Sequence, residues 1–156
     1  MSKKIHYGQH KLDDSDIEAV VEILKNGPIT QGETVEKFGK ELANYSSAKY
    51  GLAVSNGTAA LHLTALALGW QSGDIVITTP ITFLATANCI VYAGATPDFV
   101  DIDPVTYTID PNQLEEKVKT YQSQGKKVKA FIGVDYAGHP CDWIALREIA
   151  ERYELQ

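Results

Sequence analysis

This 156-residue sequence has few cysteines and no basic segment, and each of these features excludes a class of function. The only two cysteines, Cys89 and Cys141, lie far apart and form no Cys-x-x-Cys pair. We therefore expect neither a disulfide framework nor a metal site, and we interpret both as ordinary small residues. Acidic residues outnumber basic ones, giving a net charge of -6, and no Lys/Arg-rich run is present. Nucleic acid is accordingly not an expected partner.

Long apolar runs are missing as well. No segment approaches the roughly 18 to 20 apolar residues of a membrane span, and the polar start of the chain has no apolar signal-peptide core. We therefore predict a cytoplasmic protein without a membrane partner. The length suits one compact α/β unit with a real hydrophobic core.

Helical patterns dominate the first third of the chain. Residues 15–18 have the spacing of a capping box, and apolar residues then recur at helical intervals until Asn26-Gly27-Pro28. A second box at residues 30–33 leads into another amphipathic pattern. We therefore predict an N-terminal helical segment over residues 1–48.

Residues 49–156 alternate between short apolar runs and helical patterns. Buried strands are predicted over residues 50–54, 75–78, 96–100 and 128–134. Helices are predicted over residues 58–68 and 83–92, from Asp110-Pro111 onward, and from Asp142 to Tyr153. Strands joined by helical crossovers predict a largely parallel sheet with helices on both faces. Leu155 could begin a further strand.

The turn at residues 55–58 is the first feature that suggests chemistry. It joins a predicted strand to a predicted helix, where free N–H groups and the helix dipole favour an anion. Gly57 would let a ligand approach the backbone, and the Thr58 hydroxyl could donate to a phosphate oxygen. The residues match neither Gly-x-Gly-x-x-Gly nor a Walker loop. Taken alone, the turn fits an ordinary N-capped helix start somewhat better than an anion site.

Two further groups are predicted at the same edge of the sheet. Phe83 follows the second strand and could stack on a planar ring whose phosphate lies at the turn, or it could simply pack in the core. Asp135 and His139 follow the fourth strand. A carboxylate and an imidazole in a Gly/Pro turn are commonly structural, so their roles stay open.

Five motifs together resemble the sugar-nucleotide aminotransferases, which are pyridoxal-phosphate enzymes. They are Gly-Pro-Ile-Thr-Gln-Gly at 27–32, Ser-Asn-Gly-Thr-Ala-Ala-Leu at 55–61, Pro-Ile-Thr-Phe at 80–83, Val-Asp-Ile-Asp at 100–103 and Asp-Tyr-Ala-Gly at 135–138. The resemblance implies the N-terminal portion of the large domain of a fold type I transferase. It also implies that Gly57 and Thr58 bind the cofactor phosphate and that Phe83 stacks on the pyridine ring.

Within this family, residues 80–83 and 134–140 most resemble the branch that acts in pseudaminic acid synthesis. That branch transfers an amino group from glutamate to C4 of a UDP-linked 4-keto-6-deoxy-N-acetylhexosamine. Many other relatives carry His at the position of Asp135. The same likeness implies that residues bordering the sugar nucleotide are Tyr7, Gly27, Pro28, Ile29, Thr30 and Asn56.

The family's cofactor-anchoring Asp and its Schiff-base lysine normally lie further along the chain. None of the lysines present here occupies the family position, so the resemblance implies a lysine beyond Gln156 and a chain that is inactive alone. Enzymes of this fold usually work as homodimers. Two alternatives remain open: another branch of the family, acting on a different nucleotide or a C3-keto sugar, and a non-catalytic phosphate-binding module.

Overall fold

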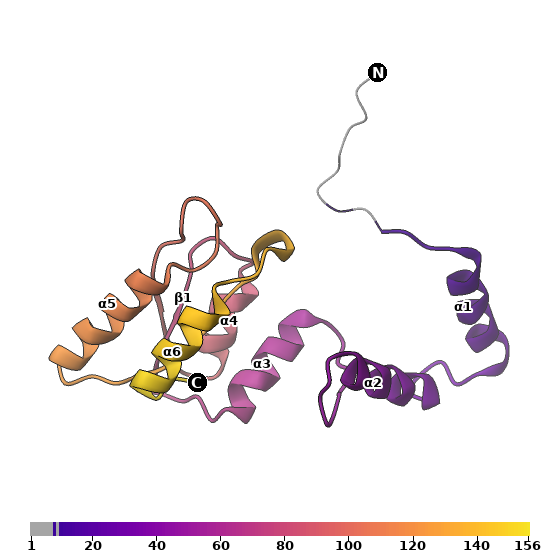
Figure 1. Cartoon of the computed structure of the whole chain (residues 1–156). Helices are drawn as coiled ribbons and strands as arrows, with labels where there is room; N and C mark the ends of the chain where they lie inside the picture. The colour runs from indigo at the N-terminus through magenta and orange to yellow at the C-terminus, as the bar shows by residue number, and fades with distance from the viewer. Residues whose placement is uncertain (1–7, 9) are drawn as a thin grey trace, which may run out of the picture. The chain divides into compact units, whose positions relative to one another are not determined.

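The computed structural model describes residue 8 and residues 10–156, and the chain divides into two compact units, Met1–Ala53 and Val54–Gln156 (Figure 1). Each unit is described by itself. Across the part of the chain that the structure describes, no helix is both long and apolar enough to cross a membrane.

The first unit contains helix α1, Asp14–Asn26, and helix α2, Glu33–Tyr45. The predicted capping box of α1 is real but lies two residues earlier, because Asp13 is the N-cap. Its Oδ1 accepts the N–H groups of Ser15 at 3.0 Å and Asp16 at 3.2 Å, while the Asp16 carboxylate accepts the Asp13 N–H. An aspartate pair at this spacing satisfies the same free donors as the Ser/Glu pair we expected.

The capping box predicted at residues 30–33 is wrong. Helix α2 begins after Gly32, which has φ +133° and offers no side-chain oxygen. Gln31 also has a positive φ of 70°, so two successive left-handed residues turn the chain into the helix. Thr30 therefore lies before the turn and not at the helix cap.

Two glycines let α2 approach the segment that follows it. A Cβ on Gly39 would lie 2.7 Å from the carbonyl oxygen of Gly51, and a Cβ on Gly51 would lie 2.1 Å from the carbonyl oxygen of Gly39. The strand predicted over residues 50–54 is wrong, since these residues form no ladder with any described strand. Most of their apolar side chains are exposed, with Tyr50 and Leu52 about 80% accessible.

The second unit is an α/β sandwich, as predicted. Its sheet has the strands β1 Ile75–Thr78, β2 Thr96–Phe99 and β3 Val128–Phe131, in the order β2-β1-β3, and both pairings are parallel. Its helices are α3 Gly57–Ala67, α4 Ala85–Tyr92, α5 Pro111–Ser123 and α6 Trp143–Tyr153, with the short 3-10 helix η1 at Tyr136–Gly138. Helices α5 and α6 begin at the predicted aspartates, which cap them: Asp110 accepts the N–H of Asn112, and Asp142 accepts that of Ala145.

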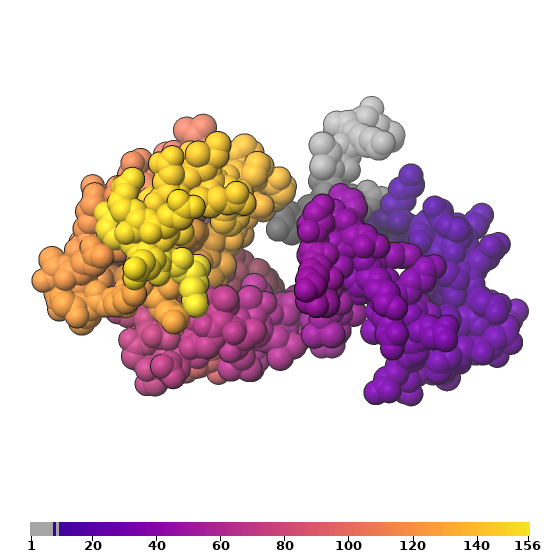
Figure 2. Space-filling model, turned by 60° about the horizontal axis from the view of Figure 1, so that its bottom comes forward, coloured from indigo at the N-terminus to yellow at the C-terminus, as the bar shows by residue number. Residues whose placement is uncertain are grey.

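Helices cover both faces of this sheet. Neighbouring residues of β1 point into different cores: Val76 packs with residues of α3 and α4, whereas Ile77 packs with residues of α5 and α6. Figures 1 and 2 both show α5 and α6, in orange and yellow, side by side on their face. Cys89 is buried in the first core and Cys141 in the second, and both thiols are free, as expected from the sequence.

An irregularity in β3 lets one strand serve both cores. Ile75 pairs with Val128 but Val76 pairs with Ala130, so Lys129 is an extra residue in the ladder. Val128 and Ala130 consequently point to opposite faces although they lie two residues apart. On the outer edge of β3, Gln156 donates its N–H to the carbonyl of Lys129 at 3.1 Å and accepts the N–H of Phe131 at 3.2 Å, which is the pattern of a parallel pair.

A polar cluster ties the edge strand β2 to helix α5. The carboxylate of Asp98 accepts the Tyr121 hydroxyl at 2.6 Å and lies 2.8 Å from Lys117 Nζ. Partial burial works to raise the pKa of Asp98, but the hydrogen bonds from Lys117, Tyr121 and the Phe99 N–H outweigh it, so the pKa is lowered. The bond to Asp98 raises the pKa of Tyr121 to about 12.

We expect Asp98→Asn to reduce the stability of the second unit by about 1 kcal/mol near neutral pH. A carboxyl group whose pKa is lowered on folding contributes stability above its unfolded value of about 3.9, and that contribution disappears as the pH falls through the folded value. The difference between wild type and variant should therefore shrink below about pH 4. Urea unfolding from pH 7 to pH 3 measures it, and parallel curves would contradict the assignment.

Candidate functional site

The turn before α3 leaves two backbone donors without an acceptor in the part of the chain that the structure describes. Asn56 is the N-cap: its side chain accepts the N–H of Ala59 at 2.8 Å, and its carbonyl accepts that of Ala60 at 3.1 Å. Among the described residues, no group accepts the N–H of Gly57 or Thr58. These two N–H groups lie at the positive end of the helix dipole and are suited to a phosphate.

Nothing in the described protein requires glycine at position 57. A Cβ there would meet no atom within 4 Å, and the backbone does not have a positive φ. The space beside the turn is thus open to a ligand. The half-buried Thr58 carries a hydroxyl with no hydrogen-bond partner among the described residues. A phosphate group fits this set of donors, whereas a cation does not.

Phe83 lies at the same edge of the sheet as the turn before α3. Helices α3 and α4 pack against each other and lead into the parallel strands β1 and β2, so both helices begin where the strands end. His62 of α3 and Tyr92 of α4 hold this packing with an edge-to-face contact of 5.4 Å between ring centroids. Phe83 follows β1 and is 76% exposed, which argues against the alternative that it packs in the core.

Asp135 closes the loop that follows β3. Its Oδ1 accepts the N–H of Cys141 at 2.9 Å and the indole N–H of Trp143 at 3.1 Å. These bonds, led by the one from Cys141, outweigh the opposing effect of burial and lower the pKa of Asp135. Gly133 lies directly under the Trp143 ring, because a Cβ there would be 2.7 Å from a ring carbon. The structure thus gives Asp135 a structural role, which the sequence left open, whereas His139 is exposed.

The thiol of Cys141 is part of the same loop. Its Sγ contacts the carbonyl oxygen of Val134 at 3.3 Å. Burial, together with the adjacent Asp135, raises the pKa of Cys141 to about 11, so the thiol stays protonated near neutral pH. Burial likewise raises the pKa of Cys89. Neither cysteine is a candidate nucleophile, because the thiolate is the reactive form.

The residues predicted to border the substrate come from both units of the chain. Tyr7 lies outside the described residues. Gly27, Pro28, Ile29 and Thr30 join α1 to α2 in the first unit, where Ile29 is exposed and Pro28 packs against Gly32. Asn56 uses its side-chain oxygen for capping and donates from Nδ2 to Ser55 at 3.3 Å. Contact of these residues with a sugar nucleotide stays a prediction.

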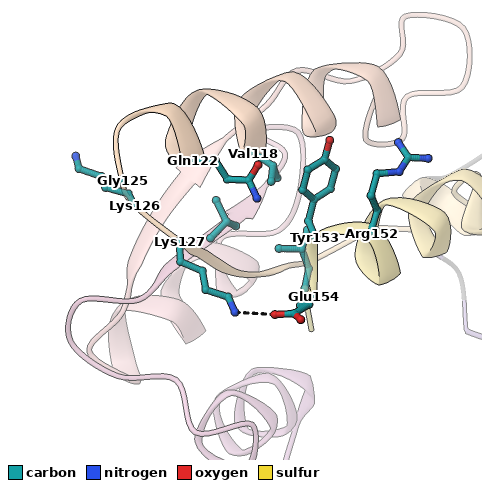
Figure 3. Close-up of a pocket in the computed structure, with 10 residues that line it drawn as sticks. Val118, Gln122, Gly125, Lys126, Lys127, Arg152, Tyr153 and Glu154 are labelled. Atoms are coloured by element: carbon teal, nitrogen blue, oxygen red, sulfur yellow. Dashed lines mark hydrogen bonds and ion pairs between the residues drawn. The ribbon is translucent and has the colours of Figure 1, made fainter.

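A separate pocket of about 470 Å³ lies at the other end of the sheet (Figure 3). It is formed where α5 and α6 end and β3 begins. Lys127 points toward Glu154 across its mouth, with 3.2 Å between Nζ and Oε2. Both side chains are mostly exposed, so the pair adds little stability. Since ligands of open parallel sheets bind at the carboxyl ends of the strands, this pocket is not the candidate site.

Metal chemistry has no support in the described residues, which contain no group of three or more His, Cys, Asp or Glu side chains arranged to hold an ion. Sequence reasoning predicted Gly57, Thr58 and Phe83 as site residues. It missed the partly buried hydroxyl pair of Thr82 and Thr86 beside Phe83, with 2.8 Å between the Oγ1 atoms. The i, i+4 spacing of two threonines at a predicted helix start was the available clue.

Curated relatives match nearly the whole chain. It is 39% identical over 158 residues to the spore coat polysaccharide biosynthesis protein SpsC of Bacillus subtilis, covering 99% of this chain and 39% of that protein. It is 38% identical over 154 residues to the GDP-perosamine synthase of Escherichia coli O157:H7, covering 98% and 41%. It is 36% identical over 140 residues to the 3-oxo-glucose-6-phosphate:glutamate aminotransferase of Bacillus subtilis, covering 90% and 30%. The chain thus spans at most about two fifths of these relatives.

Solved structures of aminotransferases are also similar to this chain. An aminotransferase from Brucella abortus superposes with a TM-score of 0.83 at 33% identity, covering 89% of this chain and 38% of that one. NtdA from Bacillus subtilis, solved with bound cofactor PMP, gives a TM-score of 0.80 at 36% identity, covering 90% and 31%. The model of one protein family matches residues 10–156. The chain belongs to the DegT/DnrJ/EryC1/StrS aminotransferase family.

Proposed function

We propose that the protein made from the complete gene is a pyridoxal-phosphate aminotransferase acting on a nucleotide sugar. The carrying observation is the pair of unpartnered N–H groups at Gly57 and Thr58, at the same sheet edge as the exposed Phe83. Family membership supports this proposal, as do a relative solved with PMP and relatives named for sugar chemistry.

Each residue of the site has a distinct task in this proposal. The N–H groups of Gly57 and Thr58 and the Thr58 hydroxyl hold the phosphate, and the helix dipole adds to its stabilisation. Phe83 covers one face of the cofactor ring and keeps water from it. When bound, the cofactor supplies the electron sink and the amino-group carrier that amino transfer requires. The lysine and the anchoring carboxylate of the family lie outside these 156 residues in this proposal.

The substrate we propose is a UDP-linked 4-keto-6-deoxy-N-acetylhexosamine, as in pseudaminic acid synthesis, with glutamate as amino donor and a homodimer as the working form. Its support is the sequence at residues 80–83 and 134–140, including Asp135 where many relatives carry His. A second candidate is a different nucleotide or a C3-keto sugar. The similarity to a GDP-perosamine synthase and to an aminotransferase named for a 3-oxo sugar phosphate favours this alternative.

A substrate panel tests the proposal. The protein is incubated with glutamate and, in turn, with UDP-linked 4-keto, GDP-linked 4-keto and C3-keto sugars, and the 2-oxoglutarate formed is measured. We expect the UDP-linked 4-keto sugar to give the highest kcat/KM. Preference for another sugar would support the alternative branch. Cofactor binding without turnover of any sugar would support a non-catalytic module.

Replacing the phosphate-binding hydroxyl is expected to weaken cofactor retention. Thr58→Ala removes a hydrogen bond to a charged phosphate, for which we expect about tenfold weaker binding of pyridoxal phosphate. Equilibrium dialysis with the cofactor's visible absorbance measures this. Thr64→Ala is a matched control, because that hydroxyl lies on the same helix but bonds the carbonyl of Ala60. Unchanged affinity in Thr58→Ala would leave the turn an ordinary helix start.

A further inference from the structure

The turn that carries Phe83 is closed by a buried threonine. Thr86 lies in the first turn of α4 and is only 6% exposed. Its Oγ1 lies 2.8 Å from Oγ1 of Thr82, and its N–H donates to the carbonyl of Phe83 at 3.0 Å. Thr86 is therefore bonded to the residue before Phe83 by its side chain and to Phe83 itself by its backbone.

Other contacts do little to fix the position of Phe83. The ring is 76% exposed and has no aromatic partner among the described residues. The N-cap of α4 is Leu84, which offers no side-chain oxygen to the free N–H groups of the helix. The hydroxyl pair of Thr82 and Thr86 bridges the turn and the start of α4, so the direction of the Phe83 side chain depends on the backbone that this pair holds.

We propose that Thr86 is a positioning residue for the cofactor-covering ring of Phe83. Its bond to Thr82 holds residues 82–86 in one conformation before the cofactor arrives, so that binding does not have to order the turn. This inference rests on the proposed function, because it assumes a planar cofactor beside Phe83. Preorganisation of this kind increases affinity by lowering the entropy lost on binding.

The size of the effect follows from one hydrogen bond between neutral groups. This hydrogen bond stabilises the turn in its binding conformation. Losing it should therefore weaken pyridoxal-phosphate binding about three- to tenfold. We expect kcat to fall less than cofactor affinity, because Thr86 is not placed to touch the reacting atoms. Thr86→Ser keeps the hydroxyl and should bind the cofactor nearly as tightly as wild type.

The molecule provides a matched control. Thr108 is 4% exposed, and its hydroxyl lies 3.0 Å from that of Thr106, in the loop between β2 and α5. Thr108→Val therefore removes the same kind of partly buried hydroxyl pair at a place without Phe83. Thr86→Val and Thr108→Val should lower the melting temperature of the cofactor-free protein by similar amounts, whereas only Thr86→Val should weaken cofactor binding.

The test combines two measurements on the protein from the complete gene. Cofactor affinity is measured by titration with pyridoxal phosphate, and the turn itself is probed by chymotrypsin cleavage after Phe83 in the cofactor-free protein. Chymotrypsin should cleave the Thr86→Val variant after Phe83 severalfold faster than it cleaves wild type or the Thr108→Val variant. If Thr86→Val does not fold, Thr82→Val removes the same bond from a half-buried partner.

The outcomes separate the two proposals. Wild-type protein that binds no pyridoxal phosphate would overturn the proposed function, and with it the role of Phe83 as a cofactor-covering ring. Wild-type binding together with equal affinities in Thr86→Val and Thr108→Val would overturn the positioning role alone. Cleavage after Phe83 at the wild-type rate in both Thr86→Val and Thr82→Val would show that the hydroxyl pair does not hold the turn.

Discussion

Gly51→Ala is expected to destabilise the packing of α2 by about 3 kcal/mol. The new Cβ would lie 2.1 Å from the carbonyl oxygen of Gly39, a separation that real Cβ atoms essentially never show. The obstacle is backbone within a helix, so no side-chain rotation can relieve it. Ala43, whose Cβ lies 3.2 Å from the same position, narrows the space further. The segment must therefore separate from α2.

Hydrogen exchange measured residue by residue detects this loss. The amides of α2 should exchange faster in Gly51→Ala by the factor that corresponds to the lost free energy, while β1 and β3 should be unaffected. Gly8→Ala is the control within the same unit, because a Cβ there meets no described atom within 4 Å. Equal protection of α2 in Gly51→Ala and wild type would show that the close approach of the two glycines does not exist in solution.

These glycines illustrate what periodicity does not reveal. The apolar run at residues 50–54 has the composition of a buried strand, yet the described part of the sheet offers it no partner. By contrast, β1 was predicted at its observed bounds, because a four-residue apolar run between turn residues has few alternatives. The fold class was predicted from the alternation of strands and helices, and one wrongly predicted strand does not change that alternation.

The candidate site was predictable only where its chemistry is local in sequence. Gly57 and Thr58 lie in one turn, and Phe83 lies in the turn between β1 and α4, so each could be proposed from the residues around it. The acceptor role of Asp135 was not predictable, because its donors on Cys141 and Trp143 come from six and eight residues away through an irregular loop. The capping error at residues 30–33 has a similar cause, since left-handed residues at 31 and 32 turn the chain before the helix.

Asp135→Ala is expected to destabilise the second unit by about 2 kcal/mol. The substitution leaves the N–H of Cys141 and the indole N–H of Trp143 without their shared acceptor. The backbone N–H of Cys141 is the more costly of the two, because it is partly buried. Without the hydrogen bond to Asp135, the Trp143 ring is also no longer held over Gly133. Urea unfolding followed by tryptophan fluorescence measures both the stability and the environment of this ring.

Asp135→Asn separates hydrogen bonding from charge. Asparagine keeps an oxygen at the position of Oδ1, so it should recover most of the stability that alanine loses. Because folding lowers the pKa of Asp135, the charged carboxylate contributes stability above the unfolded pKa of about 3.9, and this contribution is lost as the pH falls through the folded value. The small advantage of Asp over Asn should therefore vanish toward pH 3. Equal destabilisation by Asn and Ala at pH 7 would instead assign the role of Asp135 to its charge, and the hydrogen bonds to Cys141 and Trp143 would then be a consequence of the loop's fold.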